Sequence, residues 1–144
     1  MPRLHLAPLE AYPFRCRITV RTTDLNYGGH LGNDKVLTLA HEARVAFLAA
    51  RGWTELDCAG VSLIMGDAAI VFQGEAFAGD SLDIEVAASD PGRSGFRFCY
   101  RLTKAPGGAA VALVETGMVC FDYQARRIRP LPPAVAAVCA AGPE

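Results

Sequence analysis

Residues 24–52 read DLNYGGHLGNDKVLTLAHEARVAFLAARG and join a polar, glycine-rich loop directly to a long run of helix-forming residues. From Lys35 the run contains neither glycine nor proline until Gly52, and a glycine just beyond the last helical residue is a common helix end. Asn33 is a good N-cap residue, and Asp34 suits the first turn of a helix. The pattern therefore predicts one long helix between Asn33 and Gly52.

The predicted helix has two distinct faces when its residues are placed every 100°. One face is apolar and consists of Val36, Leu37, Ala40, Ala43, Phe47 and Leu48. Another carries a polar stripe of Asp34, Thr38 and His41. Arg44 falls on the apolar arc, where an unpaired guanidinium would be costly, so we expect it to have a structural partner.

The rest of the chain has β character. Phe14–Thr22 alternates apolar with basic or polar side chains, which is the period of a half-buried strand. Four further β segments follow the helix: Gly60–Gly74, Asp80–Ala88, Gly95–Thr103 and Ala109–Tyr123. We interpret the AGD, SDPGRS and KAPGG stretches between them as hairpin connections. The prolines of residues 130–133 end the last strand, and the Ala/Val-rich tail favours a short helix.

One long helix with about five strands predicts an α+β fold in which an antiparallel sheet covers the helix. The 144 residues are 51% hydrophobic and 20% charged, which is enough apolar material for one core. Neither a linker nor an internal repeat interrupts them, so we expect a single domain over residues 1–144. An open antiparallel sheet leaves an exposed edge, which favours pairing with a second copy.

Composition argues against several classes of partner. Fourteen basic and fifteen acidic side chains give a net charge of −1, so nucleic acid is not an expected partner. No apolar run approaches the roughly 18 residues of a membrane span, and residues 1–8 lack the apolar core of a secretory signal, so we expect a cytoplasmic protein. The five cysteines are widely spaced without a C-x-x-C pair, which predicts buried structural thiols and no metal site.

The loop between the first strand and the helix concentrates groups that can carry chemistry. Asp24–Asp34 holds two carboxylates, two carboxamides and one imidazole. Its glycines let a substrate approach the main chain, and the free N–H groups of the first helical turn can polarise a carbonyl. A carboxylate or an Asn-held water could supply the nucleophile. A simple polar loop with an N-cap uses the same residue types, so the residues alone leave both interpretations open.

The run RTTDLNYGGHLGND at residues 21–34, followed by HEARVAFL, resembles a known family. It is similar to the acyl-CoA thioesterases of the 4-hydroxybenzoyl-CoA thioesterase-like group, which have the hot-dog fold and the motif D-x-D-x-x-G-H-V-N-N before a helix with E-A-R. The Gly79-Asp80 turn, the GRSGFRF segment and the P-L-P at residues 130–132 also fit, and the likeness extends from about Phe14 to Pro133. It implies a curled antiparallel sheet wrapped around one long central helix. It also implies homodimers or homotetramers that bind acyl-CoA at a subunit interface without a cofactor.

The chain departs from the family motif at its catalytic position. The family's second Asp, the usual nucleophile or general base, aligns with Asn26, and an amide supplies neither its charge nor its basicity. We therefore rank Asp34 first as the general base for a water, with Asn26 orienting that water or the thioester carbonyl. Asp24 is the nearest carboxylate and either assists the reaction or braces the loop.

Several further residues are candidates for substrate binding. His30 occupies the family's G-H position and is expected to contact substrate or brace the loop rather than act as a base. The other candidates are Gly29, Asn33, Thr38, His41, Glu42, Arg93 and Ser94. Arg93 and Ser94 would contact the phosphates or pantetheine of CoA, or else form a solvated hairpin. Glu42, in the E-A-R position, is otherwise a solvated or dimer-contact residue.

The resemblance implies an acyl-CoA thioesterase that hydrolyses a small to medium acyl-CoA to free acid and CoA. The alternative is a non-catalytic protein that binds acyl-CoA and lost turnover when Asp became Asn26. A hot-dog dehydratase is disfavoured, because the chain lacks an Asp/His pair spaced as in those enzymes. The sequence does not indicate the acyl group, or whether its carrier is CoA or acyl-carrier protein.

Overall fold

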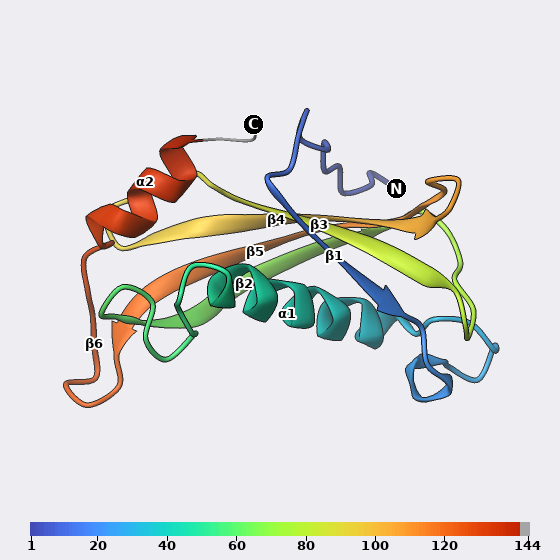
Figure 1. Cartoon of the computed structure of the whole chain (residues 1–144), viewed down its shortest axis with the longest axis horizontal. Coiled ribbons are helices and arrows are strands. Elements are labelled where there is room, and N and C mark those ends of the chain that lie inside the picture. Colours follow the sequence, from blue (N-terminus) through green and yellow to red (C-terminus); the bar gives the residue numbers. More distant parts are fainter. Residues whose placement is uncertain (142–144) are drawn as a thin grey trace.

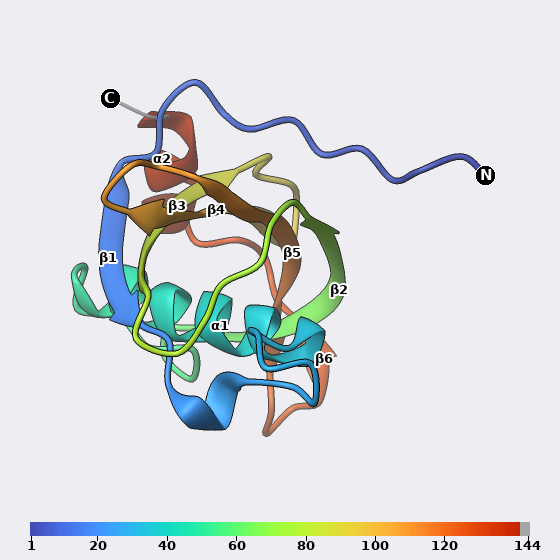
Figure 2. The ribbon, with the colours of Figure 1, turned by 90° about the vertical axis from the view of Figure 1, so that its right-hand side faces the viewer.

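Six strands and two helices make up the protein in a computed structural model that describes residues 1–141, so the last three residues of the expected domain lie outside the described part. The elements are β1 (Phe14–Thr19), the 3₁₀ turn η1 (Thr22–Asp24), α1 (Asn33–Ala49), β2 (Ser62–Phe72), β3 (Ser81–Ser89), β4 (Gly95–Ala105), β5 (Ala110–Asp122), β6 (Arg127–Ile128) and α2 (Pro133–Ala141). Residues 1–13 form an arm without helix or strand. Tyr12 packs against Arg101 of β4, and the N-terminal end of the arm extends beyond the sheet (Figure 2).

The strands form one antiparallel sheet in the order β1-β3-β4-β5-β2, and β6 pairs with the end of β5. The sheet curls around α1, so that β1 and β2 lie on opposite sides of the helix (Figures 1 and 2). α2 lies on the outer side of the sheet, next to β3. The predicted α+β class, with a curled sheet around one long helix, is confirmed.

The predicted hairpins at SDPGRS and KAPGG are confirmed, because β3 pairs with β4 and β4 with β5. The hairpin predicted at AGD is wrong: β2 pairs with β5, and β3 pairs with β1 and β4. A tight turn does form there, since Gly79 has a φ of +89° and the Asp80 carboxylate accepts the Phe77 N–H at 2.8 Å. This turn leads the chain from the edge strand β2 into β3, on the far side of β4 and β5, without pairing the flanking strands.

The helix predicted between Asn33 and Gly52 is confirmed, with small differences at both ends. Its N-cap is Gly32 rather than Asn33, and no side chain caps it. A Cβ at Gly32 would lie 2.7 Å from Asp34 Oδ1, so the glycine makes room for a carboxylate that bends back over the helix start. Gly52 is left-handed, with a φ of +75°, but lies two residues beyond the C-cap Ala50.

The core lies between the apolar face of α1 and the inner face of the sheet. Five residues of the predicted apolar face are buried, whereas Leu37 is half-buried and Leu39 takes its place in the core. The Phe47 ring packs edge to face against Phe14 of β1 and Phe98 of β4, with centroids 5.7 and 5.2 Å away. The helix is therefore held against both outer and central strands.

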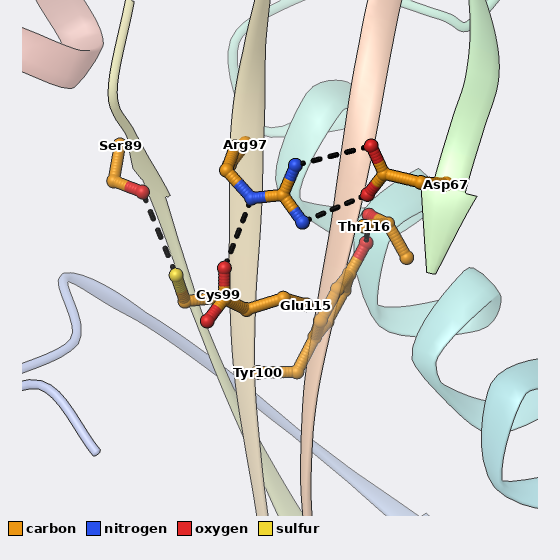
Figure 3. A network of polar contacts seen from close by, with 7 residues as sticks. All are labelled: Asp67, Ser89, Arg97, Cys99, Tyr100, Glu115 and Thr116. Atoms are coloured by element: carbon orange, nitrogen blue, oxygen red, sulfur yellow. Dashed lines mark hydrogen bonds and ion pairs between the residues drawn. The ribbon is translucent and has the colours of Figure 1, made fainter. Parts of the chain in front are cut away.

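The outer face of the sheet carries ion pairs that tie neighbouring strands together. Gly117 of β5 lies between its two cross-strand partners, Arg97 of β4 and Asp67 of β2. A Cβ at Gly117 would lie 2.7 Å from Asp67 Oδ2, so only glycine lets Arg97 reach across β5 to bind Asp67 (Figure 3). Arg97 also donates to Glu115 at 2.9 Å. The two carboxylates raise the pKa of Arg97, mainly through these hydrogen bonds.

The five cysteines are free thiols in the described chain. Cys58, Cys120 and Cys139 are buried as predicted, whereas Cys16 and Cys99 are only half-buried. Burial raises the pKa of the Cys58 thiol to about 12 and that of Cys139 to about 11. Thiols with such pKa values stay protonated near neutral pH, which suits the predicted structural role. Neither helix of residues 1–141 is long and apolar enough to span a membrane.

Candidate active site at the start of the long helix

The loop before α1 is a small hairpin closed by its own backbone. Leu25 and Leu31 form an isolated antiparallel bridge, and the Asn26 N–H donates to the His30 carbonyl at 2.9 Å. The Gly29 N–H donates to the Asn26 carbonyl at 3.0 Å, which closes a tight turn with Gly29 at a φ of +80°. The loop therefore holds Asn26 and His30 at the two ends of this turn.

Asp24 lies beneath this hairpin as a buried, charged brace. It is 1% exposed, and its carboxylate accepts hydrogen bonds from the backbone N–H, Nε and Nη2 of Arg21 at 2.8, 3.1 and 3.0 Å. The Arg21 side chain lowers the pKa of Asp24 below its ordinary value. This geometry favours bracing over assistance in catalysis, since both oxygens already have partners.

The crossover from β2 to β3 brings a second segment to the same place. The Gln73 and Gly74 N–H groups donate to the Val111 carbonyl, and the Leu31 N–H donates to the Ala76 carbonyl at 2.7 Å. Any Cβ at Gly74 would collide with the Ala110 carbonyl oxygen, so the segment can follow this path only with a glycine there. The backbone of Glu75 is thereby held between Gly74 and Ala76, next to the loop before α1.

The two segments enclose a pocket of about 450 Å³. The pre-helix loop and the start of α1 contribute Asn26, Tyr27, His30, Leu31 and Asn33, and the crossover side contributes Phe72, Gly74 and Glu75. His30 Nε2 lies 3.7 Å from Glu75 Oε2, and His30 Nδ1 lies 3.2 Å from the Leu31 carbonyl oxygen. The pocket therefore combines a carboxamide, an imidazole and a carboxylate with an uncapped helix start.

Three of the candidate residues predicted from sequence, Asn26, His30 and Asn33, line this pocket together. Asp34, the predicted base, begins the same helix, but its carboxylate bends back over Gly32 and is not part of the lining. Gly29 shapes the turn without lining the pocket. The role of Asp34 as general base stays a prediction.

The polar stripe of α1 runs away from the pocket along the helix. Thr38 donates to the Asp34 carbonyl at 3.4 Å and is exposed, as is Glu42. His41 Nε2 lies 3.2 Å from Glu55, which follows the helix. A substrate-binding role for Thr38, His41 and Glu42 is not supported by proximity to this pocket and stays a prediction.

Arg44 has the structural partners that its place on the apolar arc predicts. It donates to Glu55 at 2.5 Å and to the Tyr100 hydroxyl at 3.1 Å. The Tyr100 hydroxyl is in turn 2.7 Å from the Thr116 hydroxyl, inside the core (Figure 3 shows this last contact). Burial raises the pKa of Tyr100, which keeps its hydroxyl neutral.

Arg93 and Ser94 line a separate groove of about 310 Å³ on the outer face, together with Arg97 and Asp67. Their backbone carbonyls accept the N–H groups of Leu131 and Cys120, which gives both residues a structural task. Contact of their side chains with CoA stays a prediction.

Sequence reasoning missed Tyr27, Phe72 and Glu75. Phe72 and Glu75 reach the pocket through the crossover, and they lie more than forty residues after Asn26 in the chain. Their only local signal is the Q-G-E step at residues 73–75, where glycine interrupts a β segment. Tyr27 follows Asn26 in the chain and is fully exposed. Its one signal in the sequence is a large aromatic side chain within a polar loop.

Comparison with known proteins supports the assignment that this geometry suggests. Residues 20–139 match the model of the thioesterase-like superfamily. A 1,4-dihydroxy-2-naphthoyl-CoA hydrolase of Synechococcus elongatus is 35% identical over 118 residues, which are 78% of this chain and 85% of that protein.

Solved structures share the fold. A thioesterase from Thermus thermophilus, complexed with coenzyme A and zinc, superposes with a TM-score of 0.78 at 26% identity. The superposition covers 92% of this chain and 96% of the Thermus thermophilus chain. A 1,4-dihydroxy-2-naphthoyl-CoA thioesterase from Synechocystis gives a TM-score of 0.79 at 22% identity, covering 88% and 95%. The predicted hot-dog fold and the predicted class of enzyme, a thioester hydrolase, are confirmed. The chain belongs to the thioesterase-like superfamily.

Proposed function

We propose that this protein hydrolyses a small to medium acyl-CoA to the free acid and CoA in the pocket at the start of α1. The observation that carries the proposal is the meeting of Asn26, His30 and an uncapped helix N-terminus around one cavity. The match to a hydrolase named for a naphthoyl-CoA substrate supports a CoA thioester as the substrate.

The pocket offers two means to stabilise the reaction. The N–H groups of the first turn of α1 carry partial positive charge and suit the oxyanion that develops when water attacks a thioester carbonyl. The side-chain oxygen Oδ1 of Asn26 accepts the Gly28 N–H at 2.9 Å. The side-chain NH₂ group of Asn26 therefore remains to orient the thioester carbonyl or the attacking water. The general base that the sequence suggests is Asp34, and Asp24 holds the loop before α1 in place.

Assembly into a homodimer or homotetramer is part of the proposal. Within residues 1–141, β2 has a partner strand on one side only, and its exposed residues include Met65 at 39%. The other sheet edge, β1, is guarded by exposed Arg15 and Arg17, and charged edges discourage pairing. A second copy along β2 would also wall the pocket at Phe72, which is 56% exposed. The five free thiols of the described residues suit the reducing cytoplasm, where we place the protein.

A second function is favoured by one observation, which is the carboxamide of Asn26 at the family's catalytic Asp position. In this alternative the pocket binds acyl-CoA without turnover. A binder is stabilised thermally by acyl-CoA but releases no thiol, whereas an enzyme releases CoA repeatedly.

Thiol release from short, medium, long and aromatic acyl-CoAs tests the function on purified protein. We expect multiple turnovers with at least one ester, and loss of turnover in Asp34→Ala if this carboxylate is the base. Turnover that survives in Asp34→Ala removes Asp34 from the chemistry but leaves the enzyme. Release of no CoA from any ester, together with a rise in Tm on adding acyl-CoA, would replace the enzyme with the binder.

A further inference from the structure

Glu75 and His30 face each other inside the pocket, although they come from different elements. Their Oε2 and Nε2 atoms are 3.7 Å apart, which is longer than the roughly 2.7–3.2 Å of a direct hydrogen bond. The two side chains are 64% and 34% exposed, so a simple surface ion pair would contribute little to stability. What distinguishes this pair is that the backbone of each residue is held by hydrogen bonds. Those of Gly74 and Ala76 hold the backbone on either side of Glu75, and the bond from the Asn26 N–H to the His30 carbonyl holds that of His30.

The surroundings of His30 determine which ring nitrogen carries the proton. Nδ1 lies 3.2 Å from the Leu31 carbonyl oxygen, and a carbonyl oxygen can only accept. Nδ1 is therefore the protonated nitrogen and donates to Leu31. In the neutral ring this leaves the lone pair of Nε2 free, and Nε2 is the atom that faces Glu75.

Gly28 keeps the space beside Nε2 open. A Cβ at Gly28 would lie 3.2 Å from His30 Nε2 and also 3.2 Å from Asn26 Oδ1. The imidazole and the carboxamide therefore border one small space that a glycine leaves free. A reacting group in this space would meet both side chains.

We propose that His30, and not Asp34 as the sequence suggested, is the general base of the thioesterase, because His30 lines the pocket whereas the Asp34 carboxylate bends back over Gly32 outside the lining. Glu75 is then a positioning residue that acts through His30. This inference rests on the proposed function. One water can bridge the 3.7 Å between Nε2 and Oε2 by donating a hydrogen to each. Glu75 orients this water and then stabilises the imidazolium that forms.

The proton balance of the step is complete. The water oxygen attacks the thioester carbonyl carbon while one of its protons passes to His30 Nε2. When the tetrahedral intermediate collapses, the C–S bond breaks and the leaving sulfur of CoA takes the proton from Nε2. The products are the carboxylic acid and CoA thiol, and His30 returns to its neutral form.

The kinetic test compares His30→Gln, Glu75→Gln and Glu75→Asp with wild type on the best acyl-CoA of the panel. We expect kcat to fall roughly 10²–10⁴-fold in His30→Gln, the usual contribution of a general base. In Glu75→Gln we expect kcat to fall about tenfold with KM unchanged, and Glu75→Asp to recover part of the loss. Glu10→Gln, which changes an exposed glutamate of the N-terminal arm, is the matched control and should behave as wild type.

Two further measurements separate this role from a merely structural one. Gly28→Ala keeps both side chains but fills the space between them, so kcat should fall about tenfold or more while Tm is retained. The ¹⁵N NMR spectrum of the three histidines, with His30 identified by its absence in His30→Gln, should show His30 protonated on Nδ1 and bare on Nε2.

The outcomes distinguish this inference from the function on which it rests. If wild type releases CoA but a folded His30→Gln variant, or Gly28→Ala, keeps most of its kcat, His30 is not the base and the thioesterase stands. An Nε2-protonated His30 overturns the assignment at any level of activity. If wild type releases no CoA from any ester, the thioesterase itself is wrong and the base assignment falls with it.

Discussion

Asp24 is a carboxylate that stays charged although it is almost completely buried. Burial opposes its ionisation, but three hydrogen bonds from Arg21 outweigh burial and lower its pKa. A carboxyl group whose pKa is lowered by folding stabilises the fold at every pH above its ordinary value of about 3.9. This stabilisation is lost as the pH falls through the lowered pKa.

We expect Asp24→Ala to lower the free energy of unfolding by about 1–2 kcal/mol at pH 7, because the backbone N–H of Arg21 loses its acceptor. The difference from wild type should shrink as the pH falls below about 4, because Asp24 is then protonated in the unfolded state first and in the folded state only at its lowered pKa. Urea unfolding at pH 7 and pH 3 measures both effects. A difference that is the same at both pH values would contradict the role of the charge.

Among individual residues, the loop motif before α1 was sufficient to predict Asn26, His30 and Asn33 as parts of one site. Side-chain direction was not predictable, because the bend of Asp34 over Gly32 depends on a helix start one residue earlier than the N-cap rule indicates. Glu75 carries no motif of its own, and its place depends on the path of the crossover.

Among the elements, α1 is tied to its surroundings by one buried cation. Arg44 is 3% exposed and joins Glu55, in the segment after the helix, to Tyr100 of β4, which contacts Thr116 of β5. Removing Arg44 leaves the half-buried Glu55 carboxylate and the buried Tyr100 hydroxyl without this donor and leaves a cavity where the guanidinium was buried.

We expect Arg44→Ala to lower the free energy of unfolding by about 3 kcal/mol. Arg15→Ala, which changes an exposed arginine of β1, is the control and should have little effect. Chemical unfolding of both variants measures the difference. Equal losses in the two variants would show that the buried cluster contributes nothing special.

The elements themselves were largely predictable from period and composition, whereas the pairing of β2 was not. A glycine turn next to Asp80 looks the same in sequence whether the flanking strands pair or part. Only the tertiary register, in which Ser62 lies opposite Phe121 and Phe72 opposite Ala112, distinguishes the two cases.

For the whole molecule, the free side of β2 predicts an assembly. Light scattering should give a mass at least twice the 15.3 kDa of one chain. Ala68 is exposed near the middle of β2, so Ala68→Lys would place like charges together across a two-fold pairing. We expect this variant to shift toward the monomer. An unchanged mass would mean that the copies meet elsewhere.

The strand order also determines how the chain can fold as it is made. β2 is synthesised early, but Phe72 meets Ala112 forty positions later and Ser62 meets Phe121 fifty-nine positions later. Contacts so distant in sequence form slowly, and until they form the strand exposes its apolar side chains to other molecules. A ribosome must therefore translate nearly the whole sheet before β2 has a partner, and a chain stopped before β5 would be a substrate for chaperones rather than a smaller version of the enzyme.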